Sequence, residues 1–211
     1  MKNINEGIYN EVVNLNCYQR FVGVEDHDFV LDLGCSQGPF YFQNKDKNID
    51  YVGIDASIHC IKDFYSNFPD GDYTLINAFV FATNSVKKFN WSFYSEPELE
   101  VNSITFPGLI KLLNRKIDFL KFDIEAYEKT FLVDNYDLFK NNVRKFAGEI
   151  HLGVGSVFPR EHVYEMLEKL LSDDKISFKL YSVDGFDITD FFWTKKDYYT
   201  EIIINGSINH S

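Results

Sequence analysis

Long apolar runs, cysteine and basic charge are all scarce in this 211-residue sequence. No stretch reaches the about 18 consecutive apolar residues that a membrane-spanning helix needs, so we expect no membrane span. The N-terminal segment is polar and lacks the apolar core of a signal peptide, which favours a cytoplasmic protein. Cys17, Cys35 and Cys60 form no Cys-x-x-Cys pair, so we expect free thiols rather than a disulfide framework or a zinc site.

The charge balance is acidic, with 32 Asp and Glu against 21 Lys and Arg and a formal net charge of −11. The basic residues are scattered along the chain. General affinity for nucleic acid needs clustered Lys and Arg that displace phosphate counterions, so this composition argues against it. Hydrophobic residues make up 45% of the chain, which is enough for a large core, and the length fits one domain.

Predicted strands and helices alternate along the chain. Apolar runs predict strands at 29–33, 51–55, 73–81, 117–124, 144–152, 177–183 and 200–205. Helical spacing predicts helices at 38–43, 57–67, 105–114, 127–141 and 159–172. This alternation predicts an α/β fold with a parallel sheet and helices on both faces. Ligands of such sheets bind beyond the carboxyl ends of the strands, so we examine the residues at those ends.

The remaining regions complete the predicted organisation. Residues 1–27 form a helical lead-in, 28–205 form the domain, and 206–211 form a flexible tail. Residues 84–102, rich in aromatic and polar side chains, form an irregular or hairpin excursion.

The run FVLDLGCSQGPF ends the first predicted strand in a turn between two glycines. Gly34 and Gly38 allow positive φ and a close approach of backbone N–H groups to a ligand. Asp55 ends the next strand and can accept two hydrogen bonds from a ribose diol, although it can equally cap the following helix. After the third strand, Asn77 can contact an adenine edge or occupy a turn, and Ala78 leaves room for a ring. The turn and the acid together favour a nucleoside-type cofactor.

Charged side chains follow the fourth and fifth predicted strands. Lys121, Asp123 and Glu125 alternate along one strand and share a face, as do Glu149 and His151 on the next. Charges at the end of a buried strand are costly unless they pair or have a function, so a salt-bridge cluster and a reactive site are both open. A histidine beside a carboxylate of a neighbouring strand is a candidate for proton transfer.

Six segments of the chain, in this order, match one family: VLDLGCSQG (30–38), YVGIDAS (51–57), LINA (75–78), VNSITFPGLI (101–110), IDFLKFDIEAYEKTFL (117–132) and GEIHL (148–152). With them the sequence resembles the FkbM family of S-adenosylmethionine-dependent methyltransferases. The resemblance implies a Rossmann-like class I methyltransferase fold, with a mostly parallel seven-stranded sheet whose last strand is antiparallel. It also implies S-adenosylmethionine as the cofactor, with contacts from Asp32, Gly34, Asp55 and Asn77.

Two sets of site residues follow from the strand ends and the resemblance together. The predicted cofactor-binding residues are Asp32, Gly34, Cys35, Ser36, Gly38, Asp55, Ala56, Asn77, Ala78 and Asp123. The predicted catalytic residues are His151, Asp123, Glu125 and Glu149. His151 is the candidate general base, oriented by Glu149 or Glu125, while Glu128 caps a helix or orients a neighbour. Asp123, Glu149 and His151 have the donor types of a divalent-cation site, but they can also satisfy one another, so no metal is assigned.

With the methyl transfer that the resemblance implies, these residues predict O-methylation of a hydroxyl on a sugar, a glycan or another small molecule. The loop at 184–197 would cover the acceptor. Its aromatic residues Phe186, Phe191, Phe192 and Trp193 either line the acceptor site or pack in the core. Two alternatives are a nucleic-acid methyltransferase, which the acidic charge disfavours, and a catalytically silent binding module that keeps the fold. The oligomeric state stays open.

Overall fold

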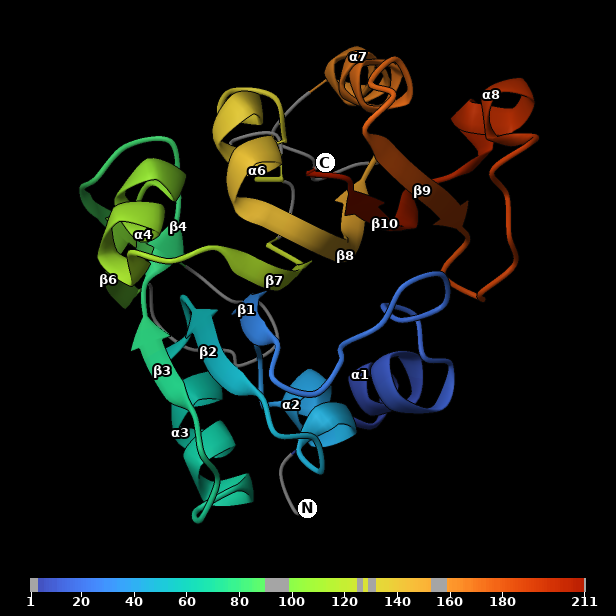
Figure 1. The fold of residues 1–211 in the computed structure, drawn as a ribbon. Helices are drawn as coiled ribbons and strands as arrows, with labels where there is room; N and C mark the ends of the chain where they lie inside the picture. Colours follow the sequence, from blue (N-terminus) through green and yellow to red (C-terminus); the bar gives the residue numbers. More distant parts are fainter. Residues whose placement is uncertain (1–3, 90–98, 125–126, 129–131, 153–158, 211) are drawn as a thin grey trace.

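The computed structural model describes residues 4–89, 99–124, 127–128, 132–152 and 159–210. Its centre is a seven-stranded sheet in the order β3-β2-β1-β7-β8-β10-β9 (Figure 1). The strands are β1 (Phe29–Leu33), β2 (Asp50–Asp55), β3 (Thr74–Asn77), β7 (Ile117–Phe122), β8 (Val143–His151), β9 (Ile176–Tyr181) and β10 (Glu201–Ile208). β10 runs antiparallel to β8 and β9, and the other paired neighbours run parallel. This confirms the mostly parallel sheet with an antiparallel last strand.

Helices cover both faces of this sheet, as predicted (Figure 1). One face carries α4 (Phe106–Leu113), α6 (Tyr136–Asn142) and α7 (Arg160–Leu171); the other carries α1 (Glu6–Tyr9), a π-helix (Asn10–Asn14), α2 (Pro39–Asn44) and α3 (Ile58–Asn67). Strand side chains alternate between two apolar cores, so Val30 and Phe119 pack on the α2 side while Leu31 and Leu120 pack on the α4 side. Among the described residues, no helix has the length and apolarity to cross a membrane.

The region after β3 forms a second, smaller sheet. The strand predicted at 73–81 divides into β3 and β4 (Phe79–Val80). β4 pairs with β6 (Leu99–Ile104), which pairs in turn with β5 (Val86–Phe89). Because β5 and β6 are antiparallel, the excursion predicted at 84–102 takes its hairpin form in the part that the structure describes.

Two predicted segments have other bounds in the structure. The segment 127–141, predicted to be mostly helix, contains a turn at 133–135, and α6 begins after it. The tail predicted to be flexible from residue 206 is part of β10 as far as Ile208, which pairs with Ile176 and is buried. The strand continues because this apolar side chain extends the core beyond the predicted end.

One buried amide ties the N-terminal segment to the middle of β10. The Asn205 side chain is fully buried. Its Oδ1 accepts hydrogen bonds from the backbone N–H groups of Phe21 and Val22 at 2.6 and 2.7 Å. Its Nδ2 donates to the carbonyl oxygens of Tyr18, Val22 and Phe146 at 3.2, 3.1 and 3.2 Å. These bonds fix the chain that follows the π-helix against the sheet.

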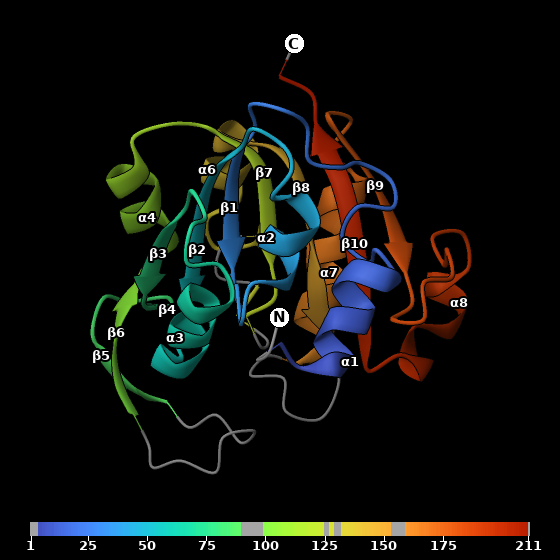
Figure 2. The same ribbon diagram turned by 90° about the horizontal axis from the view of Figure 1, so that it is seen from below.

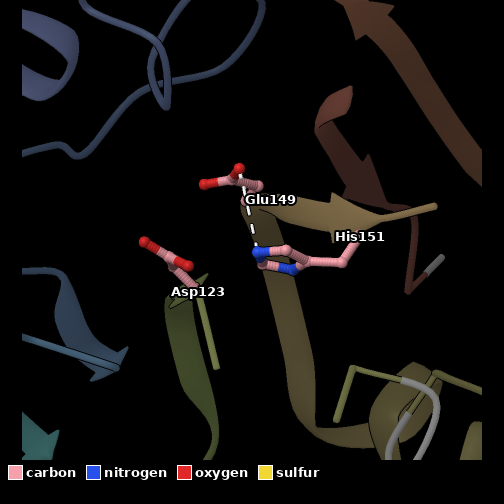
Figure 3. A group of neighbouring side chains, drawn as sticks. All are labelled: Asp123, Glu149 and His151. Atoms are coloured by element: carbon pink, nitrogen blue, oxygen red, sulfur yellow. Dashed lines mark ion pairs between the residues drawn. The ribbon is translucent and has the colours of Figure 1, made fainter. Parts of the chain in front are cut away.

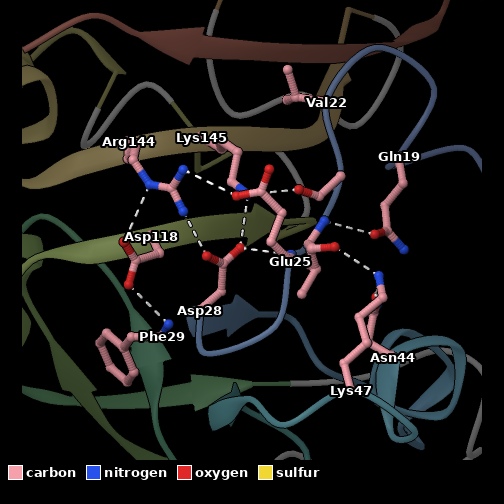
Figure 4. Close-up of polar contacts among 12 residues, drawn as sticks. Gln19, Val22, Glu25, Asp28, Phe29, Asn44, Lys47, Asp118, Arg144 and Lys145 are labelled. Atoms are coloured by element: carbon pink, nitrogen blue, oxygen red, sulfur yellow. Dashed lines mark hydrogen bonds and ion pairs between the residues drawn. The ribbon is translucent and has the colours of Figure 1, made fainter.

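An ion network closes the amino-terminal edge of the sheet (Figure 4). The buried Asp28 carboxylate contacts Lys145 Nζ at 2.8 Å and also the Arg144 guanidinium. Arg144 Nε lies 3.2 Å from Asp118 Oδ1, and Asp118 Oδ2 accepts a hydrogen bond from the Phe29 N–H at 3.0 Å. The network therefore joins the starts of β1, β7 and β8, at the edge opposite their carboxyl ends.

We predict that Asn205→Ala destabilises the protein by about 2–4 kcal/mol. The substitution leaves the part-buried Phe21 and Val22 N–H groups without their acceptor and the buried bonds to the Tyr18 and Phe146 carbonyl oxygens without their donor. A buried unsatisfied group costs about 1–3 kcal/mol, and a part-buried one costs less. Urea unfolding followed by far-UV circular dichroism measures the change. Asn14→Ala, at an exposed position on the π-helix, is the matched control and should stay within about 0.5 kcal/mol of the wild type. Equal effects of the two substitutions would refute the anchoring role of Asn205.

Candidate active site

A cavity of about 480 Å³ lies at the carboxyl ends of β1, β2, β7 and β8. Parallel strands direct these ends to one edge of the sheet, where the first and last residues of several elements meet. The polar residues that line the cavity include Glu11, Ser36, Asp55, Lys121, Asp123, Glu149, His151 and Glu201. The cavity thus brings together residues from the two predicted site sets.

The glycine turn after β1 forms one wall. Gly34 has φ of +74°, and a Cβ built on it would lie 1.8 Å from the Asp123 carbonyl oxygen. Any side chain there would therefore push β1 away from the end of β7. Gly34, Cys35 and Ser36 line the cavity, whereas Gly38 does not; Gly38, with φ of +89°, is the N-cap of α2. Because Gly34, Cys35 and Ser36 have no side chain or a small one, the backbone of this turn lies close to the cavity.

Asp55 lies against this turn from the end of β2. Its Oδ2 accepts a hydrogen bond from the Ser36 N–H at 2.8 Å, and its Oδ1 accepts one from the Ser57 N–H at 2.7 Å. The N-cap of α3 is Ser57 rather than Asp55. Burial raises the pKa of Asp55 to about 6, although these two amide bonds oppose the shift. Each carboxylate oxygen keeps a further lone pair for a ligand.

The end of β3 supports the end of β2. Asn77 Nδ2 donates to the carbonyl oxygens of Asp55 and Ala56 at 3.0 and 2.9 Å. Its amide therefore ties two strand ends together, and Asn77 does not line the cavity, whereas Ala56 and Ala78 do. Asn77 therefore makes the turn contact, one of the two roles predicted for it.

A buried ion pair lies behind the cavity wall. Asp32 is fully buried, and its carboxylate lies 3.1 Å from Lys121 Nζ and accepts a hydrogen bond from the Tyr51 hydroxyl. Lys121 Nζ also donates to the Gly34 carbonyl oxygen. Burial alone would lower the pKa of Lys121, but the Asp32 and Asp123 carboxylates raise it above its ordinary value. Lys121 therefore stays charged, and Asp32 does not line the cavity.

Asp123, Glu149 and His151 converge in the cavity (Figure 3). One ligand atom from each lies within 4.8 Å of the others, a spacing that one cation could bridge. His151 Nε2 lies 3.9 Å from Glu149 Oε1, and His151 Nδ1 lies 3.2 Å from Glu128 Oε1. His151 is thus held between two carboxylates, one on each ring nitrogen. Glu125, the fourth predicted catalytic residue, lies outside the described residues.

Three further side chains at this site carried no signal in the sequence. Tyr18 donates its hydroxyl to Asp123 Oδ2 at 3.3 Å. Glu201 begins β10 directly opposite His151, and Glu11 reaches the cavity from the π-helix. Glu201 is the first residue of an antiparallel strand, so it lies at this edge without being at the carboxyl end of a strand. Glu11 and Tyr18 come from the lead-in, where no strand end marks them.

The carboxylates make this cavity strongly acidic. Burial, together with the nearby Asp123 carboxylate, raises the pKa of Glu11 to about 7. Burial and the surrounding acids Asp123, Glu11 and Glu201 also raise the pKa of Glu149 well above its ordinary value. Glu149 therefore holds a proton near neutral pH and can donate a hydrogen bond as well as accept one.

The aromatic residues of the loop at 184–197 divide between two environments. Phe192, at the start of α8 (Phe192–Lys195), is fully buried, and Trp193 packs against it. These two follow the core-packing alternative. Phe186 and Phe191 are exposed and line a second hollow beside the cavity.

Comparison with known proteins identifies the fold. No family model matches the chain, and no curated protein matches its sequence. Aeropyrum pernix fibrillarin, crystallised with natively bound S-adenosyl-L-methionine, has a TM-score of 0.57 at 12% identity, over 95% of this chain and 76% of that chain. A Streptococcus thermophilus rRNA methylase has a TM-score of 0.53 at 9% identity, over 100% of this chain and 99% of that chain.

A third similar structure is also a methyltransferase. The O-methyltransferase from Bacillus cereus, in complex with SAH, has a TM-score of 0.52 at 10% identity, over 98% of this chain and 83% of that chain. Together these likenesses show that the chain has the Rossmann-like fold of class I S-adenosylmethionine-dependent methyltransferases. The fold is shared by an rRNA methylase and an O-methyltransferase, so the acceptor has to be argued from the residues of this chain.

The raised pKa of Glu11 predicts a pH-dependent stability difference. Between its usual 4.5 and about 7 the unfolded chain releases this proton while the folded chain keeps it. The contribution of Glu11 to stability is therefore present below about pH 4.5 and is lost as the pH rises through about 7. Relative to the wild type, Glu11→Gln should gain on the order of 1 kcal/mol more at about pH 8 than at about pH 4, after allowance for partial exposure.

Urea unfolding at the two pH values measures this difference. Glu165→Gln, at an exposed position on α7, is the matched control and should show the same small effect at both pH values. A Glu11→Gln effect that does not change with pH would contradict the buried environment of Glu11.

Proposed function

We propose that the protein is an S-adenosylmethionine-dependent methyltransferase that methylates a hydroxyl of a sugar, a glycan or another small molecule. The proposal is carried by one observation: the glycine turn, Asp55 and His151 line the same cavity. A cofactor-binding turn and a proton acceptor then face one space, in a fold that methyltransferases share. The resemblance to the FkbM family supports the same reaction class.

The proposed cofactor site follows the wall formed by β1, β2 and β3. Asp55 accepts the ribose hydroxyls through the lone pairs that its two backbone amides leave free. The backbone of Gly34 and Ser36 approaches the methionine part, and Ala56 and Ala78 leave space for the adenine ring. Asp32, Gly38 and Asn77 act through the turn and the strand ends that they hold, rather than from the cavity lining.

His151 is the proposed general base. S-adenosylmethionine supplies a methyl group on a positively charged sulfur. The acceptor oxygen forms a bond to the methyl carbon as the carbon–sulfur bond breaks, and the hydroxyl proton passes to His151 Nε2. In the tautomer in which Nδ1 donates its hydrogen bond to Glu128, Nε2 carries the lone pair that takes the proton.

Asp123 and Glu149 are the proposed acceptor-binding residues. Asp123 accepts a hydrogen bond from an acceptor hydroxyl, and protonated Glu149 donates one. The same pair and His151 have the donor set of a divalent-cation site. The proposal routes no step through a metal, and these three side chains act on the acceptor alone.

A nucleic-acid acceptor is the alternative that the charges disfavour. Among the described residues lining the cavity, the single basic side chain with a fixed charge is Lys121, and it is paired with Asp32. A phosphate backbone would meet the carboxylates of Glu11, Asp123 and Glu201 instead.

A second alternative is a binding module without activity, which would keep the cofactor site and lack turnover.

Calorimetric titration with S-adenosylhomocysteine tests the cofactor site. We expect micromolar binding to the wild type and about 10- to 100-fold weaker binding to Asp55→Ala, because charge-assisted hydrogen bonds contribute about 1.5–3 kcal/mol. Asp70→Ala, which removes an exposed carboxylate in the turn after α3, is the control and should bind as the wild type does. Absence of binding to all three proteins would overturn the cofactor assignment.

A second prediction concerns the proton acceptor. His151→Ala should lower the turnover of a hydroxyl acceptor by about 10²- to 10⁴-fold, the usual contribution of general acid–base catalysis. Release of S-adenosylhomocysteine with a panel of hydroxylated acceptors measures it, and EDTA should leave the wild-type rate unchanged. Full turnover by His151→Ala and Asp123→Ala would remove both residues from the mechanism, and loss of the rate in EDTA would assign them to a metal.

A further inference from the structure

A second hollow of about 390 Å³ lies beside the candidate active site. Its lining residues come from the start of β10, the loop between β9 and β10 and the 3₁₀-helix Lys196–Tyr198. Figure 2 shows the end of β9 and the start of β10 on the side of the molecule that carries α8. Glu201 lines both this hollow and the larger cavity. A ligand in the hollow would therefore lie directly beside a ligand in the reaction cavity.

Three exposed aromatic rings line this hollow. Phe186, Phe191 and Tyr198 expose 70%, 41% and 83% of their surfaces. Soluble proteins rarely gather large apolar side chains at one exposed place unless it contacts a ligand or partner. Aromatic rings that are exposed beside a cavity also make good binding surfaces, because they offer a large contact area and lose little side-chain entropy.

The backbone that carries these rings is held in place. The Phe186 N–H donates to Ser182 Oγ at 3.2 Å, and its carbonyl oxygen accepts a hydrogen bond from the Ser182 N–H at 2.9 Å. Tyr198 packs edge-on against Tyr199, which stacks on the buried Phe192. Phe186 is therefore carried by a hydrogen-bonded turn, and Tyr198 packs on residues of the core. The backbone at these rings needs little further ordering when a ligand binds.

The polar residues in the hollow restrict the ligand class. Asp184 and Glu201 contribute carboxylates, and Thr200 contributes a hydroxyl. Among the described residues that line the hollow, none is Lys or Arg. None of these lining side chains would offer a counter-charge to a phosphodiester or another anion. A purely apolar partner would bury the two carboxylates without hydrogen-bond donors, which is costly.

We propose that this hollow is a subsite for a neutral oligosaccharide, and that it binds the sugar residue next to the one that is methylated. The C–H face of a sugar ring packs on the aromatic rings, and its hydroxyls donate hydrogen bonds to Asp184 and Glu201. The inference rests on the proposed function and makes it more specific, because it assigns an acceptor of more than one sugar unit.

An array that displays neutral monosaccharides, neutral oligosaccharides, sulfated glycans and single-stranded RNA tests the proposal. The labelled wild-type protein, with S-adenosylhomocysteine present, should be retained by neutral oligosaccharides in preference to the other probes. Phe186→Ala and Tyr198→Ala should each weaken that retention about 3- to 10-fold, since an aromatic contact contributes about 0.5–1.5 kcal/mol. Tyr65→Ala, which removes an exposed ring on α3, is the matched control and should bind as the wild type does.

Three outcomes would overturn the subsite. These are no retention by any neutral oligosaccharide, equal losses in Phe186→Ala and Tyr65→Ala, or a preference for RNA or sulfated glycans. Calorimetry with S-adenosylhomocysteine on the same samples separates the two proposals. Intact cofactor binding with a failed array removes only the subsite, whereas lost cofactor binding in the wild type removes the proposed function itself.

Discussion

The ion pair between Asp32 and Lys121 is the interaction on which the architecture of the site depends. Both residues are buried on neighbouring strands of the sheet, with Asp32 exposing 0% and Lys121 4% of its surface. Lys121 Nζ also donates a hydrogen bond to the Gly34 carbonyl oxygen. One ammonium group therefore holds β1, β7 and the glycine turn in register. Removal of one partner from a buried ion pair leaves an uncompensated charge and lowers the stability of a protein by about 3–5 kcal/mol. Asp32 and Lys121 are therefore stable in these positions only together.

The direction of β10 explains why the cavity is so acidic. Parallel strands bring their last residues to this edge, whereas an antiparallel strand brings its first. Glu201 is thereby placed opposite His151, among the acids contributed by β7 and β8. The N-terminal segment adds Glu11 from the other side. Burial, together with the neighbouring carboxylates, raises the pKa values of Glu11 and Glu149, so these two side chains hold protons into the neutral pH range.

The sequence predicts the sheet and much of the cavity because both follow from local patterns. Apolar runs mark the strands, and the strand-end rule correctly brings Asp55, Asp123, Glu149 and His151 to one cavity. Asp32 differs because it lies within β1, where the Lys121 ammonium and the Tyr51 hydroxyl cover its carboxylate. Glu11 and Tyr18 could not be placed from the sequence, since their positions depend on contacts with residues more than a hundred positions away, such as the bond from Tyr18 to Asp123.

The anchoring of the N-terminal segment by Asn205 has a consequence for the order of assembly on the ribosome. The bond from the Phe21 N–H to Asn205 spans 184 positions of the chain. Synthesis proceeds from the N-terminus, and contacts between distant positions form late. The segment that carries Glu11 and Tyr18 is made first, yet its anchor emerges with the last strand. The wall of the cavity that is translated earliest is thus the last to be closed, and a nascent chain lacks a complete site until β10 is added.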